Sequence, residues 1–454
     1  MRIAPYVCLV MAVLLAMSLP ARAEVRSEYL ELEGWAEPNT PPEHNKLGIL
    51  RYWTDEKPAT AAVILIPGNG GGAPSLGIVG RWLAENAGVE VWAVDRRSNH
   101  LEDHAGTDQA LNDGNVMAAG MYYLSGAYKA VDYDDVPFLK HWGLRTHLND
   151  IAEVVKRIQA RGIKAIFLGG HSLGAMMTQA YAAYELPDGR PAYEDLRGLI
   201  LFDGSMLGSR GKGNLDKRIA QVEEQIEDGL VFPVDLPQGG MVSELIIIAA
   251  SLDPEGASMI APFVQEMTKV TSPLTNLALF GVALDTDFKF HALCRAGRLA
   301  EADPDNPDAP GEWVRYDQCG EVTDALALAT ALAEGRGAME WYQPLALMLD
   351  MGKASRAMLD LPEMGLKHHK EMDLPVIAFL ANAEGYDFAE GLKGYAASIK
   401  GKTDIHTIDP PGTYAHLDPI VAADADDRVF EPLKAWMTHV VATTDERESA
   451  GGAD

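Results

Sequence analysis

The stretch of sequence that decides the fold is Gly170-His171-Ser172-Leu173-Gly174. It directly follows the apolar run 163–168, which predicts a buried strand, and it opens the segment 173–184, which predicts a helix. A residue in a sharp turn from strand to helix has a strained backbone, and side chains two positions away on either side would collide with it. Glycine at positions 170 and 174 removes those collisions. The turn therefore indicates that Ser172 is a nucleophile, with a glycine-rich turn and a capping serine as the alternative interpretation.

Strand and helix patterns alternate on both sides of this turn. Short apolar runs predict further strands at 61–66, 89–94 and 199–202, and amphipathic patterns predict helices at 78–87 and 148–161. Such alternation is typical of right-handed βαβ units. The sequence therefore predicts an α/β fold with a mostly parallel sheet that helices cover on both faces.

The alternation stops after about residue 205 and resumes at about residue 373. The interrupting segment is rich in Met and Ala, and most of its apolar runs predict helices. Two independent domains are a weaker alternative, because the last strands and helix are too few to fold alone. We therefore predict one α/β core in two parts, 24–205 and 373–442, with a helical cap inserted at 206–372 and a flexible tail at 443–454.

Residues 1–23 have the features of a secretory signal peptide. Arg2 supplies the positive start, an apolar run covers residues 7–19, and Ala21-Arg22-Ala23 is a cleavage site of the A-x-A type. The run of about 13 residues is too short to cross a bilayer as a helix, and no later stretch is long enough either. We therefore expect a periplasmic or secreted protein without stable membrane insertion; a retained N-terminal anchor is the alternative.

The cysteine count agrees with export. Cys8 lies in the predicted signal peptide, which leaves Cys294 and Cys319 in the mature chain. An even number of cysteines in an oxidising compartment favours a disulfide. We therefore expect one bridge between them, with two unrelated thiols as the alternative.

Composition and charge exclude several classes of protein. Hydrophobic residues make up 47% and charged residues 23% of the chain, which is ordinary for a globular protein. The 38 Lys and Arg residues against 66 Asp and Glu residues give a formal net charge of −28, so a nucleic-acid partner is not expected. The sequence shows neither a metal-ligand spacing nor a dinucleotide-binding glycine motif, and we expect no metal or cofactor.

A second glycine-rich turn, Pro67-Gly68-Asn69-Gly70-Gly71-Gly72, follows the predicted strand 61–66. Negative charge that develops on a carbonyl oxygen requires fixed N–H donors, and glycines let the backbone approach closely. The candidate donors of such an oxyanion hole are the amides of Asn69 and Leu173. A flexible turn or a phosphate loop is the alternative, although the Lys-Ser/Thr ending of a P-loop is missing.

A general base is expected in a loop beyond the last strand, and His416 lies there, between the strand at 405–408 and the last helix. The side chain of His171 is expected to point away from Ser172. For His291, His368 and His369, which fall in the insertion, a structural or exposed role is expected.

The acid that orients the histidine is ambiguous in the sequence. Glu384 occupies the turn after the strand at 374–380 and is our first candidate, and Asp387 lies three residues further in the same loop. Asp203, at the end of the strand 199–202, is the other alternative.

Together, the elbow at 170–174, the glycine turn at 67–70 and the late His416 resemble the α/β-hydrolase superfamily. The resemblance covers roughly residues 60–205 and 373–442, and the insertion lies where such enzymes carry a cap. Pro67 stands where a histidine often precedes the first glycine of the oxyanion loop.

The resemblance implies a serine hydrolase that works through an acyl-enzyme. The Met- and Leu-rich insertion favours carboxylic esters of small molecules or acyl groups as substrates. A peptidase or amidase of the same fold is the alternative activity, with a cofactor-free haloperoxidase or an acyltransferase further away. From another class, a catalytically silent binding protein would also keep this fold. The oligomeric state is not predicted.

Overall fold

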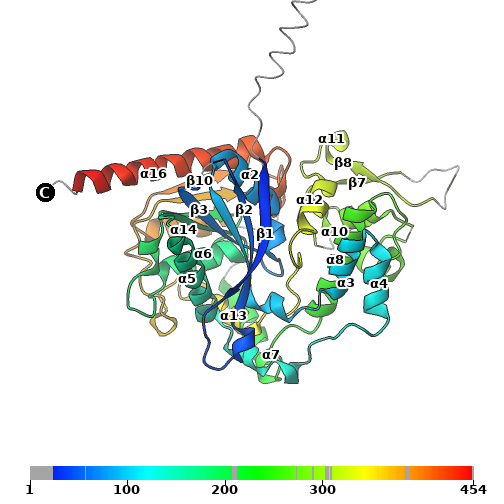
Figure 1. Cartoon of the computed structure of the whole chain (residues 1–454), viewed down its shortest axis with the longest axis horizontal. Coiled ribbons are helices and arrows are strands. Elements are labelled where there is room, and N and C mark those ends of the chain that lie inside the picture. Colours follow the sequence, from blue (N-terminus) through cyan, green and yellow to red (C-terminus); the bar gives the residue numbers. More distant parts are fainter. Residues whose placement is uncertain are drawn as a thin grey trace, which may run out of the picture.

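The computed structural model describes residues 24–56, 58–206, 212–271, 273–288, 291–301, 306, 309–383 and 388–451. Within these residues a central sheet of eight strands has the order β1-β2-β4-β3-β5-β6-β9-β10 (Figure 1). Its strands are β1 (Val25–Glu33), β2 (Lys46–Thr54), β3 (Ala61–Ile66), β4 (Glu90–Asp95), β5 (Ala165–His171), β6 (Gly198–Phe202), β9 (Val376–Leu380) and β10 (Thr403–Thr407). From β4 to β10 all neighbours are parallel, whereas β1 and β2 are antiparallel to their neighbours. The predicted mostly parallel sheet is confirmed.

Helices cover both faces of this sheet. Alternate residues of β3 show this directly, because Val63 and Leu65 pack in one hydrophobic cluster while Ala62, Ile64 and Ile66 pack in another. The first cluster includes α2 (Gly77–Ala87) and α16 (Glu431–Gly451), and the second includes α5 (Leu144–Ala160), α6 (Leu173–Ala183) and α14 (Phe388–Ser398). All six residues of β3 are buried, which explains why the strand is a continuous apolar run.

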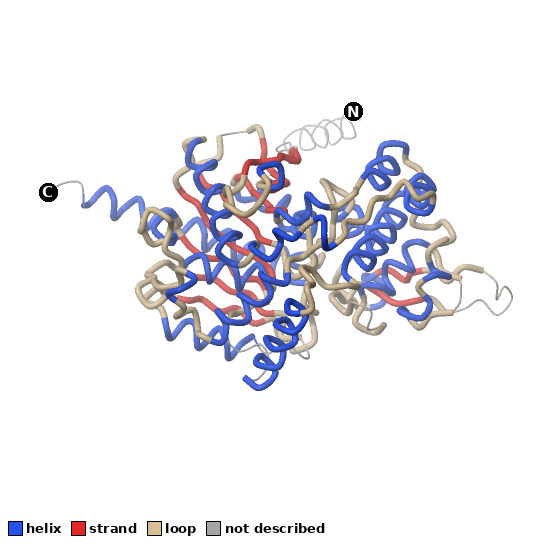
Figure 2. Tube along the Cα trace, turned by 90° about the horizontal axis from the view of Figure 1, so that it is seen from below, coloured by secondary structure: helices blue, strands red, loops and turns tan. Residues whose placement is uncertain are grey.

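The residues between β6 and β9 form mainly helices, as predicted. They are α7 (Lys212–Glu227), α8 (Leu236–Leu252), α9 (Gln265–Thr268), α10 (Asn276–Leu284), α11 (Tyr316–Cys319), α12 (Ala325–Leu332) and α13 (Leu345–Arg356). A small antiparallel pair, β7 (Gly297–Leu299) and β8 (Trp313–Arg315), lies among them. Figure 2 shows the central sheet in one half of the molecule and this small sheet among helices in the other.

The helices beyond the central sheet form two groups. One consists of α7 and α13, which pack against each other, with α13 also touching α5 and α6. The other is built around α8, which packs against α10 and α12. This second group also takes α3 (Ala105–Asp113) and α4 (Val116–Leu124), which precede β5 in the chain (Figure 1). Ala110, Ala119 and Ile248 form a small apolar cluster there, so residues 105–124 lie with the inserted helices although we predicted them within the core segment.

One expectation is wrong, and one helix is longer than predicted. Helix α16 continues to Gly451, past residue 443, where the predicted tail begins; its Glu, Arg and Ala residues have high helix propensity. Cys294 and Cys319 are free thiols instead of a disulfide. Cys294 is fully buried beside Asp418, while the Cys319 thiol donates to Arg315 O, at the end of β8, at 3.2 Å. The two sulfurs thus have separate surroundings.

Two further predictions concern the N-terminus and the membrane. Residues 1–23, the predicted signal peptide, lie outside the described residues. Among the described helices, none combines the length and the apolar character that crossing a membrane requires.

Candidate active site

Ser172 lies in a strained turn between β5 and α6. Its backbone has φ 54° and ψ −114°, which a residue with a side chain rarely adopts. The Ser172 N–H donates to Phe202 O at 3.0 Å, which ties the turn to β6. A Cβ at Gly170 would lie 2.4 Å from the carbonyl carbon of Gly174, and a Cβ at Gly174 would lie 2.0 Å from Ile66 O. The predicted need for glycine at both positions is therefore explained by specific backbone contacts.

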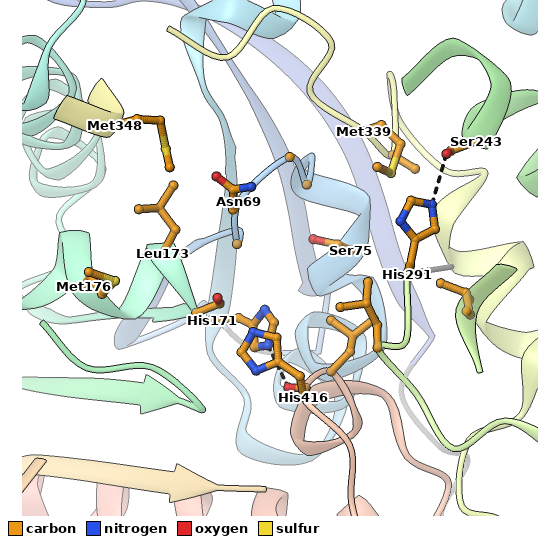
Figure 3. A pocket seen from close by; sticks show the side chains of 18 of the residues that line it. Asn69, Ser75, His171, Leu173, Met176, Ser243, His291, Met339, Met348 and His416 are labelled. Carbon is orange, nitrogen blue, oxygen red and sulfur yellow. Dashed lines mark hydrogen bonds between the residues drawn. The ribbon is translucent and has the colours of Figure 1, made fainter. Parts of the chain in front are cut away.

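Ser172 and His416 line the same cavity, which has a volume of about 410 Å³. Asn69, Leu173 and His171 line it as well (Figure 3). Each of these residues follows or ends a strand of the central sheet or lies in the loop that follows β10, so the carboxyl ends of the parallel strands bring them together. We call Ser172, His416, Asn69 and Leu173, together with Asp203, which contacts His416, the floor of the cavity.

Asp203 is the carboxylate that contacts His416. It follows β6 directly with φ 39°, and its Oδ2 lies 2.5 Å from His416 Nδ1. Its other oxygen, Oδ1, accepts from Ala381 N at 2.8 Å, and both side chains are buried. Because a carboxylate only accepts, Nδ1 carries the proton, and Nε2 is then the nitrogen that holds a lone pair in neutral imidazole. The arrangement fixes the tautomer that a general base requires.

The order of preference among the acids is therefore revised. Glu384 was the first candidate, but the structure brings the alternative, Asp203, to His416. Glu384 and Asp387 themselves lie outside the described residues. In the sequence, the strand 199–202 ending at Asp203-Gly204 was the signal for this residue.

His171, whose side chain the sequence predicted to point away from Ser172, lines the cavity beside His416. Its ring lies 4.6 Å from that of His416 between centroids, and its Nε2 lies 2.9 Å from His416 O. Burial, together with the nearby His416, lowers the pKa of His171 to about 3, so its imidazole is neutral at neutral pH. Since a carbonyl oxygen can only accept, Nε2–H is the donor. His171 thus holds the backbone of the histidine loop.

Two backbone N–H groups beside Ser172 have no hydrogen-bond acceptor among the described residues. They belong to Asn69, in the turn after β3, and to Leu173, the first residue of α6. The first amides of a helix lack an acceptor within the helix. Both residues line the cavity, which is where an oxyanion would need donors.

Helices on opposite sides supply the walls of the cavity. The first wall comes from α7 and α13, with Met176 of α6, and it is largely apolar; its residues include Met176, Leu215, Ile219, Val222, Met348 and Met351. The second wall comes from α8, α10 and adjoining loops; its residues include Ser243, Ile246, Ile247, Phe280, Leu284 and His291.

The second wall carries a polar pair that sequence reasoning missed. Ser243 Oγ lies 3.3 Å from His291 Nε2, and Figure 3 shows the two side chains on the opposite side from Met348. Ser243 also donates to Gly239 O at 2.8 Å. His291 was expected to have only a structural or exposed role, and nothing in its local sequence indicates that it lines the cavity.

One group of metal-ligand residue types occurs among the described residues. Glu102, His104 and Glu244 each offer a ligand atom, and these atoms lie within 4.8 Å of one another. The two ring nitrogens of His104, however, already face carboxylates, at 2.9 Å from Glu102 Oε2 and 3.3 Å from Glu244 Oε2. Burial alone would lower the pKa of His104, but the two carboxylates outweigh it and hold that pKa well above its ordinary value. His104 thus lies between two carboxyl groups, one facing each ring nitrogen.

Comparisons with solved structures agree with this architecture. A "putative lipase" from Sulfolobus solfataricus matches over 91% of this chain and 94% of its own, with 17% identity and a TM-score of 0.52. A carboxyl esterase from Bacillus coagulans matches over 91% and 99%, with 13% identity and a TM-score of 0.45. A monoglyceride lipase from Saccharomyces cerevisiae matches over 93% and 97%, with 14% identity and a TM-score of 0.42.

No family model and no curated protein sequence matches the chain. At 17% identity, the likeness to the Sulfolobus protein shows the fold alone. The chain has the α/β-hydrolase fold.

Proposed function

We propose that this protein is a serine hydrolase that acts on carboxylic esters. The observation that carries the proposal is the combination of a strained Ser172 with His416 in one cavity, where His416 Nδ1 is hydrogen bonded to Asp203. A strained serine on a strand-to-helix turn exposes its Oγ, and a histidine held by a carboxylate can take its proton.

In the proposed reaction, Ser172 Oγ attacks the ester carbonyl carbon while His416 Nε2 takes the hydroxyl proton. The carbonyl oxygen becomes an oxyanion, which accepts hydrogen bonds from the amides of Asn69 and Leu173. The imidazolium gives its proton to the leaving alkoxide, and the alcohol departs from an acyl-enzyme on Ser172. Water then attacks the acyl carbon, with His416 as base again, and the carboxylic acid and free serine are formed.

The two walls support an ester that is mostly apolar. The Met, Leu and Ile side chains of the first wall suit an acyl chain, and the Ser243–His291 pair on the second wall suits a leaving group that carries a hydrogen-bonding atom. We propose that residues 206–372 act as the cap, with residues 105–124 packed against its α8. The lipase description of the Sulfolobus protein agrees with an ester substrate.

The proposed location is outside the cytoplasm, in the periplasm or medium. The argument is the charged start, short apolar run and A-x-A site of residues 1–23. N-terminal sequencing of protein secreted by the native host tests it: a mature start at Glu24 supports cleavage, and a chain that still begins at Met1 contradicts it.

The activity is tested with p-nitrophenyl esters and a fluorophosphonate probe, which forms a covalent bond with an activated serine. We expect hydrolysis and stoichiometric labelling at Ser172, and loss of both in Ser172→Ala at unchanged thermal stability. Matched anilides distinguish the amidase alternative, which requires faster cleavage of the amide. A folded wild type that neither hydrolyses esters nor is labelled would support the silent binding protein instead.

A further inference from the structure

The turn that carries Asn69 is held by one buried arginine. Arg96 follows β4, and its side chain is 2% exposed. Its Nη1 donates to Pro67 O at 3.0 Å, and its Nη2 lies 3.0 Å from Gly68 O and 3.1 Å from Gly71 O. A single guanidinium thus contacts three carbonyl oxygens of the loop 67–72, which we call the oxyanion loop.

The contact with Gly68 O determines where the Asn69 N–H points. These two groups belong to one peptide unit, and in a trans peptide C=O and N–H point in opposite directions. The only cis bond among the described residues is Asp409–Pro410, so this unit is trans. Because Arg96 holds Gly68 O on one side of the loop, the Asn69 N–H is directed to the other side. We propose that Arg96 is a positioning residue that orients the Asn69 amide toward the oxyanion. The inference rests on the proposed function.

The insertion supplies the counterion of Arg96. Glu340 Oε2 lies 3.0 Å from Arg96 Nε and 2.5 Å from Nη2, and the Glu340 side chain is 0% exposed. Ser98 Oγ donates to the other oxygen of this carboxylate. A buried guanidinium without a carboxylate would be strongly unfavourable, so Glu340 is needed to keep Arg96 in place.

The segment that carries Glu340 is itself hydrogen bonded to the oxyanion loop. Gly72 N donates to Ala338 O at 2.8 Å, and Glu340 N donates to Gly70 O at 2.9 Å. On its other side this segment is held by the acids around His104, because Met339 N and Trp341 N donate to Glu244 and Glu102. The cap and the oxyanion loop are therefore joined by hydrogen bonds, and the position of the oxyanion donor depends on residues from both.

The neighbouring Arg97 provides a matched control. Its side chain is 0% exposed and pairs with Asp150, with Nε 2.8 Å from Oδ2, and Nη2 donates to Trp35 O at 3.0 Å. It is as buried and as tightly paired as Arg96, but its partners, Asp150, Asn45 and Trp35, lie outside the oxyanion loop. Lysine at either position keeps the charge but lacks the planar fork of donors.

The test compares Arg96→Lys with Arg97→Lys. Measured are kcat and KM for p-nitrophenyl butyrate, the thermal midpoint, and inhibition by an aryl trifluoromethyl ketone, which forms a tetrahedral oxyanion on an active serine. For Arg96→Lys we expect kcat to fall about 10- to 100-fold, KM to change less than about threefold, and ketone affinity to fall in parallel with kcat. Arg97→Lys should lower the thermal midpoint similarly while kcat stays within about threefold of the wild type.

Equal loss of kcat in both variants would show a purely structural role and overturn the inference, as would unchanged kcat in Arg96→Lys. If Arg96→Lys does not fold, Glu340→Gln decides: a folded variant should lose about 3- to 10-fold in kcat, and unchanged kcat overturns the inference. A wild type without hydrolysis or fluorophosphonate labelling would overturn the proposed function and this inference together, whereas an active, labelled wild type isolates the inference.

Discussion

The floor and the walls of the cavity are built on different principles. The floor consists of residues at strand ends, and backbone geometry fixes them: positive φ at Ser172 and Asp203, and amides directed by helix start and turn. The walls consist of side chains on helices from segments far apart in the chain, such as α7 with α13. If the proposed function holds, this difference assigns the reaction to the floor and the selection of the substrate to the walls. Floor variants should therefore change kcat for every ester, and wall variants should change only the preference among esters.

The largest effect is expected at Asp203. Asp203→Asn keeps the shape but no longer fixes His416 Nδ1–H, so kcat should fall about 10³- to 10⁴-fold for short and long esters alike. Glu384→Gln is the control and should leave kcat within about threefold. Steady-state kinetics on a chain-length series measures both. A large loss of kcat in Glu384→Gln with little loss in Asp203→Asn would show that Glu384, and not Asp203, is the acid that orients His416.

The floor could largely be predicted from sequence because its signals are local. The glycines two residues before and after Ser172 indicate the strained strand-to-helix turn. His416 is indicated by its position in the chain, in the loop after the last strand. Asp203 was only an alternative, because a carboxylate after either of two neighbouring strands can reach the same histidine. Only the three-dimensional path of β6 and its turn shows that Asp203 reaches His416.

The walls could not be predicted in this way. Ile219, Ile247 and Met348 line one cavity only because separate helices pack around it. In its own segment, each has the pattern of an ordinary core residue. The sequence also contains no indication of the role of Arg96, because an arginine after a strand does not show that its side chain binds three carbonyl oxygens. The predicted disulfide is wrong for a similar reason, because an even number of cysteines does not show whether two of them lie close together in the fold.

The second prediction concerns the rigidity of the floor. Gly174→Ala would place a Cβ 2.0 Å from Ile66 O, so the free energy of unfolding should fall by about 3 kcal/mol. Gly120→Ala is the control: a Cβ there meets nothing within 4 Å, and alanine in helix α4 should raise stability by about 0.5–1 kcal/mol. Urea unfolding followed by circular dichroism measures both. Equal stability of the two variants would contradict a backbone-determined turn.

The third prediction concerns Asp418, two residues after His416, which joins the histidine loop of the floor to the insertion that supplies wall residues. Asp418 accepts from Ala415 N at 2.7 Å in the histidine loop, and from Thr323 Oγ1 at 2.6 Å in the insertion. Burial raises its pKa from 3.8 to about 7, although the hydrogen bonds it accepts act in the opposite direction. The folded state therefore binds this proton more tightly than the unfolded state.

This difference in proton binding determines how stability changes with pH. The stabilising contribution of protonated Asp418 is complete below about pH 4 and is lost as pH rises toward 7, at up to about 1.4 kcal/mol per pH unit. Asp418→Asn should remove that slope between pH 4 and 7, as measured by urea unfolding at each pH. Burial also raises the pKa of Asp95 to about 7. The part of the pH dependence of stability that comes from Asp95 should persist in Asp418→Asn and serves as an internal reference. An unchanged slope in Asp418→Asn would show that this carboxylate is already ionised in the folded protein.

The smallest effect is expected on the first wall, where Met348 of α13 faces the cavity. Met348→Phe reduces the room for an acyl chain, so kcat/KM for a dodecanoate ester should fall about 10-fold while that for an acetate ester stays within about twofold. Met121→Phe, at a side chain 66% exposed on α4, is the control and should change neither value. If Met348→Phe slows acetate and dodecanoate equally, this side chain acts on the reaction rather than on selection. The division between floor and walls would then fail at the residue where it is easiest to test.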